Sequence, residues 1–250
     1  MARDLSGARV LITGASSGVG LAAARQFAAE GARVGLLARR ADLLGEIADS
    51  LGPAAHAFPV DVADPDAVAS RVEAAEAALG GLDVTVNAAA VVEPLSLEAM
   101  GADAWRQVID VNLSGSFYVA RESALRMRAA GAGVIINIGS DLASMGAANF
   151  VHYCAAKAGL VGMTRGMAAE LAPVVRVNAV CPGPIDTPMM DAQLALAPDP
   201  AAAREASKQA VPLGRFASPE EVVAAVRFLA VDAPFATGTV MALDGGTTAV

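Results

Sequence analysis

The sequence has few aromatic residues and few cysteines. Its 250 residues include two tyrosines, one tryptophan and two cysteines. Cys154 and Cys181 are too few for a disulfide framework and lack zinc-ligand spacing, so the chain suits a reducing compartment. Each cysteine is expected to be a small buried apolar residue.

Long apolar runs and clusters of positive charge are also missing. No apolar stretch approaches the ~20 residues of a membrane span, and the opening MARDLSGARV carries Arg3 and Asp4 where a signal peptide needs its apolar region. The net charge of -8, without a run of Lys or Arg, argues against nucleic acid or an anionic membrane as partner. We expect a cytoplasmic protein that handles small molecules or contacts proteins, and no His, Cys, Asp or Glu cluster suggests a metal.

Short apolar runs alternate with longer Ala-rich segments along the chain. This alternation is typical of a parallel sheet covered on both faces by helices, and because no linker interrupts it we predict a single α/β domain, residues 1–250. Strands are expected at 8–13, 33–37, 56–60, 83–87, 133–139, 175–180 and 239–244. Helices are expected near 18–30, 40–50, 65–79, 103–129, 151–172 and 218–231.

The stretch from Pro182 to Pro212 breaks this alternation. It holds six prolines and no predicted strand, with one short helix expected at 199–210. A long insertion in a compact domain is usually functional or mobile. We therefore predict that residues at about 187–212 form a lid over a substrate.

The segment VLITGASSGVGLAAARQFAAEG (10–31) predicts a strand, a glycine-rich turn and a helix. Glycines let the backbone approach a ligand, and the first amides of the helix suit a pyrophosphate. A merely tight turn would explain one glycine but hardly all of Gly14, Gly18 and Gly20. Three residues separate the first two glycines, so the spacing differs from G-x-G-x-x-G.

The segment HYCAAKAG (152–159) places one of the two tyrosines, Tyr153, four residues before Lys157. On a helix these two positions share a face. The pKa of a free tyrosine is near 10, and a lysine cation within ~4–6 Å favours the phenolate. The pair suits proton transfer to or from a substrate oxygen, although such pairs also arise on helix surfaces.

Together these motifs resemble the short-chain dehydrogenase/reductase family, whose members carry T-G-x-x-x-G-x-G at the glycine turn. Ser140 lies thirteen residues before Tyr153, Asn112 lies in VIDVNLSGSF, and CPGPIDTPM (181–189) matches the segment beside the nicotinamide. The resemblance covers nearly the whole chain. It implies a Rossmann-type, doubly wound, seven-stranded sheet and a homo-oligomer, either a tetramer or a dimer.

The resemblance also implies a catalytic set. Tyr153 would be the general acid/base, Ser140 would hold and polarise the substrate oxygen, and Asn112 would fix a water in a proton relay. Lys157 would lower the pKa of Tyr153 and bond the nicotinamide ribose. Each residue has a structural alternative: Ser140 as a turn cap, Asn112 as a helix-bend asparagine and Lys157 as a lysine that reaches solvent.

For the cofactor, the end of the second strand decides between NAD(H) and NADP(H). Ala38 stands where NAD-preferring members usually have Asp, and Arg39 and Arg40 follow. Arg39 is the better candidate to clamp the 2′-phosphate of NADP; the alternative is that both arginines are solvated or pair with an acid such as Asp42. We expect NADP(H), with NAD(H) still open. The residues expected to bind the cofactor are Gly14, Ser16, Ser17, Gly18, Val19, Gly20, Arg39, Asp61, Val62, Asn87, Tyr153, Lys157, Pro182, Gly183, Ile185 and Thr187.

Several positions allow two roles or depart from the family pattern. Asp61 either contacts the adenine or caps the next helix, for which Asp64 is better placed. In DVTVNAAA (83–90), Ala88 and Ala90 replace Asn and Gly of the usual N-N-A-G, which puts cofactor affinity in question. Asp141 is less usual after the serine; it either faces the substrate or caps a turn, and we expect the cap. His152 is expected at the surface or an interface.

The function expected from these residues is an NADP(H)-dependent oxidoreductase that acts on a carbonyl/secondary alcohol pair. The alternatives are a 3-oxoacyl-(acyl-carrier-protein)-type reductase, an NAD-dependent alcohol or sugar dehydrogenase, and a non-catalytic dinucleotide-binding sensor. A largely apolar substrate pocket is expected because the candidate lid and its surroundings contribute Phe150, Met189, Met190, Leu194 and Leu196.

Overall fold

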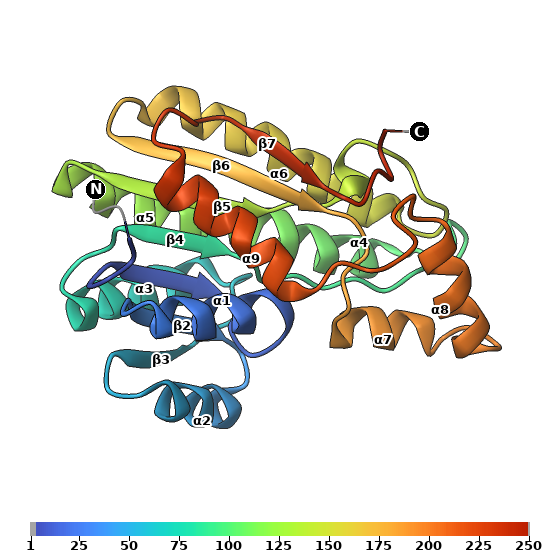
Figure 1. Ribbon diagram of the computed structural model, residues 1–250, viewed down its shortest axis with the longest axis horizontal. Helices are drawn as coiled ribbons and strands as arrows, with labels where there is room; N and C mark the ends of the chain where they lie inside the picture. Colours follow the sequence, from blue (N-terminus) through green and yellow to red (C-terminus); the bar gives the residue numbers. More distant parts are fainter. Residues whose placement is uncertain (1–3, 250) are drawn as a thin grey trace.

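A seven-stranded parallel sheet forms the centre of the molecule (Figure 1). The computed structural model describes residues 4–249, and the strand order is β3-β2-β1-β4-β5-β6-β7. All six strand pairings are parallel. The strands are β1 (Arg9–Thr13), β2 (Arg33–Ala38), β3 (Ala55–Pro59), β4 (Val84–Asn87), β5 (Gly133–Ile138), β6 (Val175–Pro182) and β7 (Val240–Leu243). Each lies within two residues of its predicted bounds, and the order reverses at β1 and β4, the point where ligands bind in such sheets.

Helices cover both faces of the sheet, as the alternation predicts. They include α1 (Gly18–Ala29), α2 (Ala41–Leu51), α3 (Pro65–Leu79), α4 (Ala102–Ile109), α5 (Ser116–Ala130), α6 (Val151–Leu171) and α9 (Pro219–Arg227). The helix predicted at 103–129 is divided, because a π-helical segment at Asp110–Gly115 separates α4 from α5.

The two faces of the sheet carry separate hydrophobic cores. In β1, Val10 and Ile12 pack into the core beneath α1, α2 and α9, whereas Leu11 packs into the core beneath α3, α5 and α6. Successive side chains of a strand point to opposite faces. A strand buried on both faces therefore reads as an unbroken apolar run, which is why VLI in β1 and VII in β5 could be recognised.

Capping residues set two helix starts where the sequence indicates them. The Ser218 hydroxyl accepts from the Glu221 N–H at 3.2 Å, and the Glu221 carboxylate accepts from the Ser218 N–H at 2.8 Å. Asp64 accepts from the first amides of α3, so the preference for Asp64 over Asp61 as the cap is confirmed.

The segment from 188 to 209 forms two helices, α7 (Pro188–Leu194) and α8 (Pro200–Gln209), not one. The expectation of a single short helix was therefore incomplete. Thr187 caps α7 and Pro188 occupies its first turn, the arrangement that Ser218 and Pro219 give α9. In Figure 1 both helices lie beyond the carboxyl ends of the strands.

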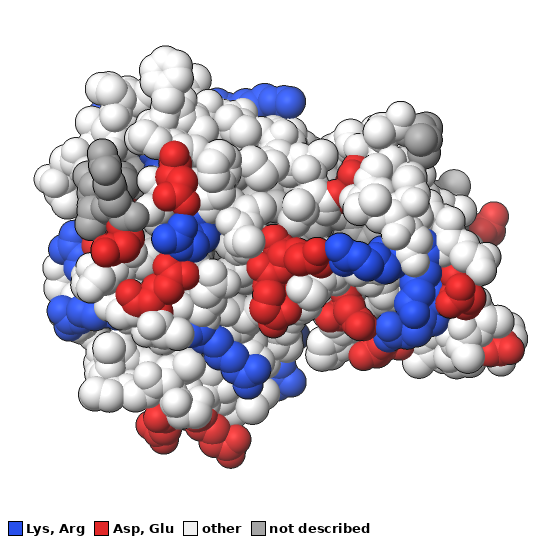
Figure 2. Space-filling view, viewed as in Figure 1, with Lys and Arg blue, Asp and Glu red and all other residues white. Residues whose placement is uncertain are grey.

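The surface carries charges of both signs. Figure 2 shows acidic and basic side chains interspersed over the face that it displays. None of the helices formed by the described residues has the length and apolar character needed to cross a membrane.

Candidate active site

A cavity of about 600 Å³ opens at the carboxyl ends of the strands. Its wall includes Gly14 after β1, Ala38 of β2, Ala88 after β4, Ile138 of β5 and Pro182 of β6. The cavity thus lies over the point where the strand order reverses, and α7 contributes to its outer wall.

The glycine turn fits closely against the cavity wall. Gly14 has φ +66°, and a Cβ added there would lie 2.8 Å from the Ala88 carbonyl oxygen. A Cβ on Gly20 would lie 2.4 Å from the Gly14 carbonyl oxygen. Both neighbours are backbone atoms that cannot yield, so glycine is required. The turn ends at Gly18, where the unpaired amides at the start of α1 suit a pyrophosphate.

Thr13 holds the segment that departs from the family pattern. Its hydroxyl accepts hydrogen bonds from the N–H groups of Ala88 and Ala89, both at 3.0 Å. The backbone beside the glycine turn is therefore tied to β1 although Ala88 has no polar side chain.

Asn87 lies behind the cavity wall instead of lining it. The side chain is buried, and its Nδ2 donates to the Ser116 carbonyl at 3.1 Å and to Asn137 Oδ1 at 2.9 Å. The side chain is thus engaged within the protein, and the direct cofactor contact of Asn87 stays a prediction. Its amide joins β4 to β5 and to the start of α5.

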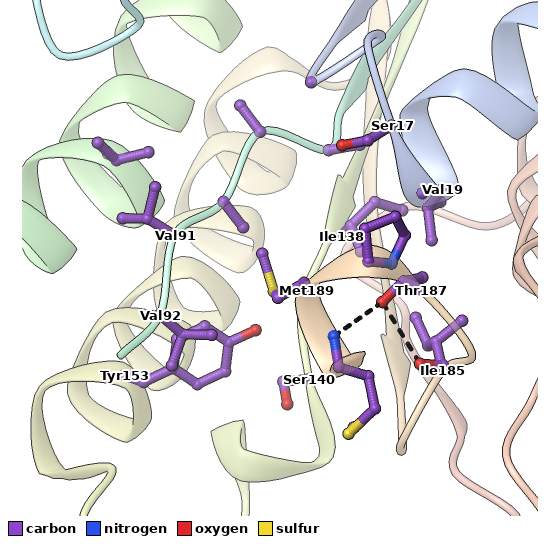
Figure 3. Close-up of a pocket in the computed structure, with 18 of the residues that line it drawn as sticks. Ser17, Val19, Val91, Val92, Ile138, Ser140, Tyr153, Ile185, Thr187 and Met189 are labelled. Carbon is purple, nitrogen blue, oxygen red and sulfur yellow. Dashed lines mark hydrogen bonds between the residues drawn. The ribbon is translucent and has the colours of Figure 1, made fainter. Parts of the chain in front are cut away.

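Tyr153, Lys157 and Ser140 line the same cavity. Figure 3 shows the Tyr153 hydroxyl pointing into the cavity, toward the space between Met189 and Ser140. Lys157 is fully enclosed; its Nζ donates to the Ile138 carbonyl at 2.7 Å and lies 5.5 Å from the centroid of the Tyr153 ring. The predicted i, i+4 pair therefore exists on α6, and the alternative that Lys157 reaches solvent is wrong.

Burial shifts the pKa values of both residues of this pair. Burial raises the pKa of Tyr153, and the negative charge of Asp141 raises it further, while the Ser140 hydroxyl offsets part of the rise. Burial also lowers the pKa of Lys157 to about 8. Desolvation is thus the largest influence on the pKa values of both residues, and the Lys157 Nζ is directed at the Ile138 carbonyl.

Asp141 is a site residue whose role the sequence showed only in part. It is 9% exposed and lines the cavity, and its Oδ1 accepts from the Leu142 N–H at 2.8 Å, which confirms the expected turn cap. The same Oδ1 accepts from the Ser140 hydroxyl at 2.8 Å. Burial raises the pKa of the Asp141 carboxyl, and these hydrogen bonds lower it in part.

Asn112 is buried at the π-helical segment and does not line the cavity. Its Nδ2 donates to the carbonyls of Val91 and Val108, both at 2.8 Å, and its Oδ1 accepts from the Val91 N–H at 3.3 Å. These contacts match the helix-bend alternative. Through them Asn112 holds Val91, which does line the cavity.

Two arginines line the cavity beyond β2. Arg40 donates from Nη2 to the Ser16 hydroxyl at 2.9 Å, so it is tied to the glycine turn. Arg39 is exposed and makes no side-chain hydrogen bond or ion pair within residues 4–249. The alternative that these arginines pair with Asp42 is not found within residues 4–249, and Arg40 is a candidate that the sequence ranked below Arg39.

The remaining cofactor candidates fall in two groups. Most lie at the cavity, and these are Ser16, Ser17, Gly18, Val19, Asp61, Val62, Pro182, Gly183, Ile185 and Thr187. Gly20 lies behind them, against Gly14. The Thr187 hydroxyl accepts from the Met190 N–H at 3.4 Å, a bond drawn in Figure 3.

The outer part of the cavity is mainly apolar. Its lining residues from the neighbouring loops and from the α7–α8 segment are Val91, Val92, Pro94, Phe150, Met189, Met190, Gln193, Leu194 and Ser207. Leu196, which was expected there, is instead 66% exposed.

Of three residues near the site, two differ from their expected burial. His152 is fully buried, so its expected place at the surface is wrong; its Nδ1 accepts from the Tyr153 N–H at 2.9 Å. Cys181 is buried as expected, whereas Cys154 is only part-buried, and both thiols are free.

Comparison with known proteins identifies the family. A family model described as enoyl-(acyl carrier protein) reductase matches residues 14–248. A cis-4-hydroxycyclohexanecarboxylate dehydrogenase of Sinomonas cyclohexanicum is 42% identical over 96% of both chains. The chain belongs to the short-chain dehydrogenase/reductase family.

Other members of this family support the assignment along the full length of the chain. A 3-oxoacyl-(acyl-carrier-protein) reductase of Thermotoga maritima is 39% identical, with 97% of this chain and 98% of that protein covered. The ligand-free aldohexose dehydrogenase of Thermoplasma acidophilum has a TM-score of 0.90 at 33% identity, over 98% of this chain and 96% of that one. Short-chain dehydrogenases/reductases use NAD(P)(H), and the chain is an oxidoreductase of this family.

The site residues fit such a dinucleotide. Gly14 and Gly20 fit tightly against neighbouring backbone, and Gly18 and Val19, at the start of α1, line the cavity. Within residues 4–249 there is no group of three or more His, Cys, Asp or Glu side chains that could hold a metal ion.

Proposed function

We propose that this protein is an NADP(H)-dependent oxidoreductase that interconverts a carbonyl and a secondary alcohol, with Tyr153 as general acid/base. The observation that carries the proposal is that Tyr153, Ser140 and Lys157 share one cavity with the glycine turn. A hydride carrier and a proton-transferring group are the two parts that this chemistry needs.

In this proposal, the chain's own residues handle the proton and the substrate oxygen. The bound nicotinamide supplies or accepts the hydride. Tyr153 gives its proton to the carbonyl oxygen in reduction, or takes the alcohol proton in oxidation, and Ser140 positions that oxygen. Lys157 holds the nicotinamide ribose, and Asn112 fixes the cavity wall at Val91, with a place in a proton relay as its further proposed role. The raised pKa of Tyr153 keeps its proton in place at neutral pH, which suits reduction.

Support for NADP(H) comes from the residues beyond β2. Ala38 provides no carboxylate for a ribose 2′-hydroxyl, and Arg39 and Arg40 both line the cavity there. A guanidinium suits a phosphate because it offers several donors in a planar fork. The 2′-phosphate site is therefore formed by both arginines, with Arg40 oriented by Ser16.

Support for an apolar substrate comes from the outer part of the cavity and from two relatives. The dehydrogenase from Sinomonas cyclohexanicum acts on a hydroxylated cyclohexane acid, as its name states, and the Thermotoga maritima protein is named as a 3-oxoacyl reductase. The apolar residues of the outer cavity and of α7 can accept either a ring or an acyl chain. A cyclic ketone/secondary alcohol pair is the leading substrate class, and a 3-oxoacyl thioester is the second.

The test is turnover by the purified protein with NADPH or NADH on a panel of cyclic ketones and 3-oxoacyl thioesters. We expect kcat/KM to favour NADPH, and Tyr153→Phe to lower kcat by about 10²–10⁴-fold, the usual contribution of a positioned acid or base. Tyr118→Phe, at the other tyrosine of the chain, is the matched control and should keep its activity. A clear preference for NADH would contradict the role of the arginines. An active Tyr153→Phe variant would remove the assigned acid/base.

A further inference from the structure

The contact between Ser140 and Asp141 has a definite hydrogen-bond direction. Asp141 Oδ1 accepts from the Leu142 N–H at 2.8 Å, and an ionised carboxylate can only accept hydrogen bonds. The Ser140 hydroxyl, 2.8 Å from the same oxygen, must therefore be the donor. In this structure the single proton of Ser140 is directed at Asp141, so this hydrogen bond competes with donation to Tyr153 or to a substrate oxygen.

This direction matters because a phenolate needs a hydrogen-bond donor. The Ser140 hydroxyl can stabilise ionised Tyr153 only if it turns away from Asp141. The carboxylate of Asp141 also opposes a negative charge on Tyr153. Hydrogen-bond direction and charge thus act in the same sense, and both keep the proton on Tyr153.

We propose that Asp141 is a positioning residue, which directs the Ser140 proton away from Tyr153 and so holds Tyr153 as a proton donor for carbonyl reduction. The inference rests on the proposed function of the site. Its consequence is that alcohol oxidation, which needs a proton acceptor at Tyr153, is displaced to higher pH.

Several other titratable groups lie near Ser140 and Asp141 and influence the protonation of Asp141 and Tyr153. Tyr153 and Lys157 face it from α6, and Cys181 faces it from β6. Asp244, after β7, opposes the ionisation of Asp141 through its charge. Burial raises the pKa of Asp244, but hydrogen bonds from Thr248 and Gly246 outweigh it and keep this pKa below the usual value. Asp141 is the acid among them that contacts Ser140.

Two substitutions separate the charge of Asp141 from its hydrogen bonds. Asp141→Asn removes the charge but keeps an Oδ1 that can accept from both Ser140 and Leu142. Asp141→Ala removes both. The control is Asp103→Asn, which removes one negative charge from a fully exposed side chain on α4.

The first measurement is the pH dependence of kcat/KM for alcohol oxidation. We expect the rising limb of the profile to move to lower pH by about 1–2 units in Asp141→Asn, the usual effect of removing one nearby charge. Asp141→Ala should show at least this shift and, in addition, about a 10-fold loss of kcat for reduction, because the Ser140 hydroxyl is no longer oriented. Asp103→Asn should match the wild type.

The second measurement does not depend on turnover. Tyrosinate has its own ultraviolet absorbance, and subtracting the Tyr153→Phe spectrum leaves the signal of Tyr153 alone, because the chain's other tyrosine is Tyr118. In Asp141→Asn, this signal should rise at a pH at least one unit lower than in wild type. Circular dichroism at each pH shows that the protein is still folded.

The two measurements keep the inference apart from the proposed function. If no substrate is turned over by the wild type but the tyrosinate signal shifts, the proposed function fails while the effect of Asp141 on Tyr153 stands. If Asp141→Asn leaves both the absorbance and the pH profile unchanged, Asp141 is a turn cap alone and the inference is wrong.

Discussion

Lys157 is a buried cation whose lost contact with water is replaced by a hydrogen bond to one backbone carbonyl. It is 2% exposed, it makes no ion pair within the described part of the chain, and its Nζ donates to Ile138. Desolvation of a charged amine is costly, which is why its pKa falls to about 8. In the free protein this residue therefore lowers stability.

The lowered pKa of Lys157 predicts that the free energy of unfolding depends on pH. The unfolded chain keeps this proton up to pH 10.5, whereas the folded protein releases it near pH 8. Between these values the unfolded state binds more protons, so the stability of the wild type relative to Lys157→Met should rise with pH, by about 3 kcal/mol in all. Chemical denaturation of both proteins below pH 8 and near pH 10.5 measures the difference.

The matched control is Lys208→Met, at the other lysine of the chain, which lies part-buried on α8. Its stability relative to wild type should not change over this pH range. A flat difference between wild type and Lys157→Met would show that Lys157 is not desolvated in the folded protein.

Residue types and spacings predicted which side chains meet, but not how they are oriented. Tyr153 and Lys157 could be paired from the helix repeat, and the resemblance to the family added Ser140 at the end of its strand. The choice between Arg39 and Arg40 depends on side-chain rotamers, as does the bond from Ser140 to Asp141. No spacing in the sequence specifies a rotamer, so these contacts needed the structure.

At the scale of elements, the strands were predictable and the helix interruptions were not. Apolar runs between turns marked the strands, because the central strands are largely buried, whereas β3 and β7 at the edges of the sheet are only partly buried. The π-helical segment around Asn112 has no such pattern, since it depends on one side chain bonding the backbone of Val91 and Val108. The helix α7 was missed because seven residues are too few to show a helical period, although Thr187 and Pro188 gave its start.

Arg204 on α8 connects the two helices of the candidate lid to the rest of the chain. Its guanidinium pairs with Asp186 at 3.0 Å and also with Asp191 of α7, and it lies 5.4 Å from the centroid of the Phe216 ring. These contacts join α8 to α7, to the segment that follows β6 and to the loop before α9.

Removing the Arg204 contacts should loosen the α7–α8 segment. In Arg204→Met we expect faster protease cleavage between α7 and α8, at 195–199, and a rise in substrate KM of about 2–5-fold, because solvent-exposed ion pairs contribute little individually. Lys208→Met, on the same helix, should cleave at the wild-type rate. Equal cleavage of Arg204→Met and wild type would show that the apolar contacts of α7 and α8 hold the segment by themselves.

At the scale of the whole molecule, α5 and α6 present a surface that packing within one chain does not explain. Phe117 and Leu125 on α5 are 41% and 48% exposed. On α6, Gly162 and Gly166 are exposed, and a Cβ added to either would meet nothing within 4 Å. Glycine inside a helix costs about 1 kcal/mol relative to alanine, and here neither the backbone angles nor the space within the chain requires it.

We expect this surface to pair with a second copy of the chain, because small residues allow close approach of helices and the exposed apolar side chains of α5 would be covered. Light scattering of the purified protein should give a mass that is a multiple of 25.0 kDa. Gly162→Gln should lower this mass without lowering the stability of the single chain, because the new side chain extends into open space and improves helix propensity. Leu213→Glu, at an exposed apolar residue in the loop after α8, is the control and should leave the mass unchanged. An oligomer that survives Gly162→Gln would show that the chains pair through another face.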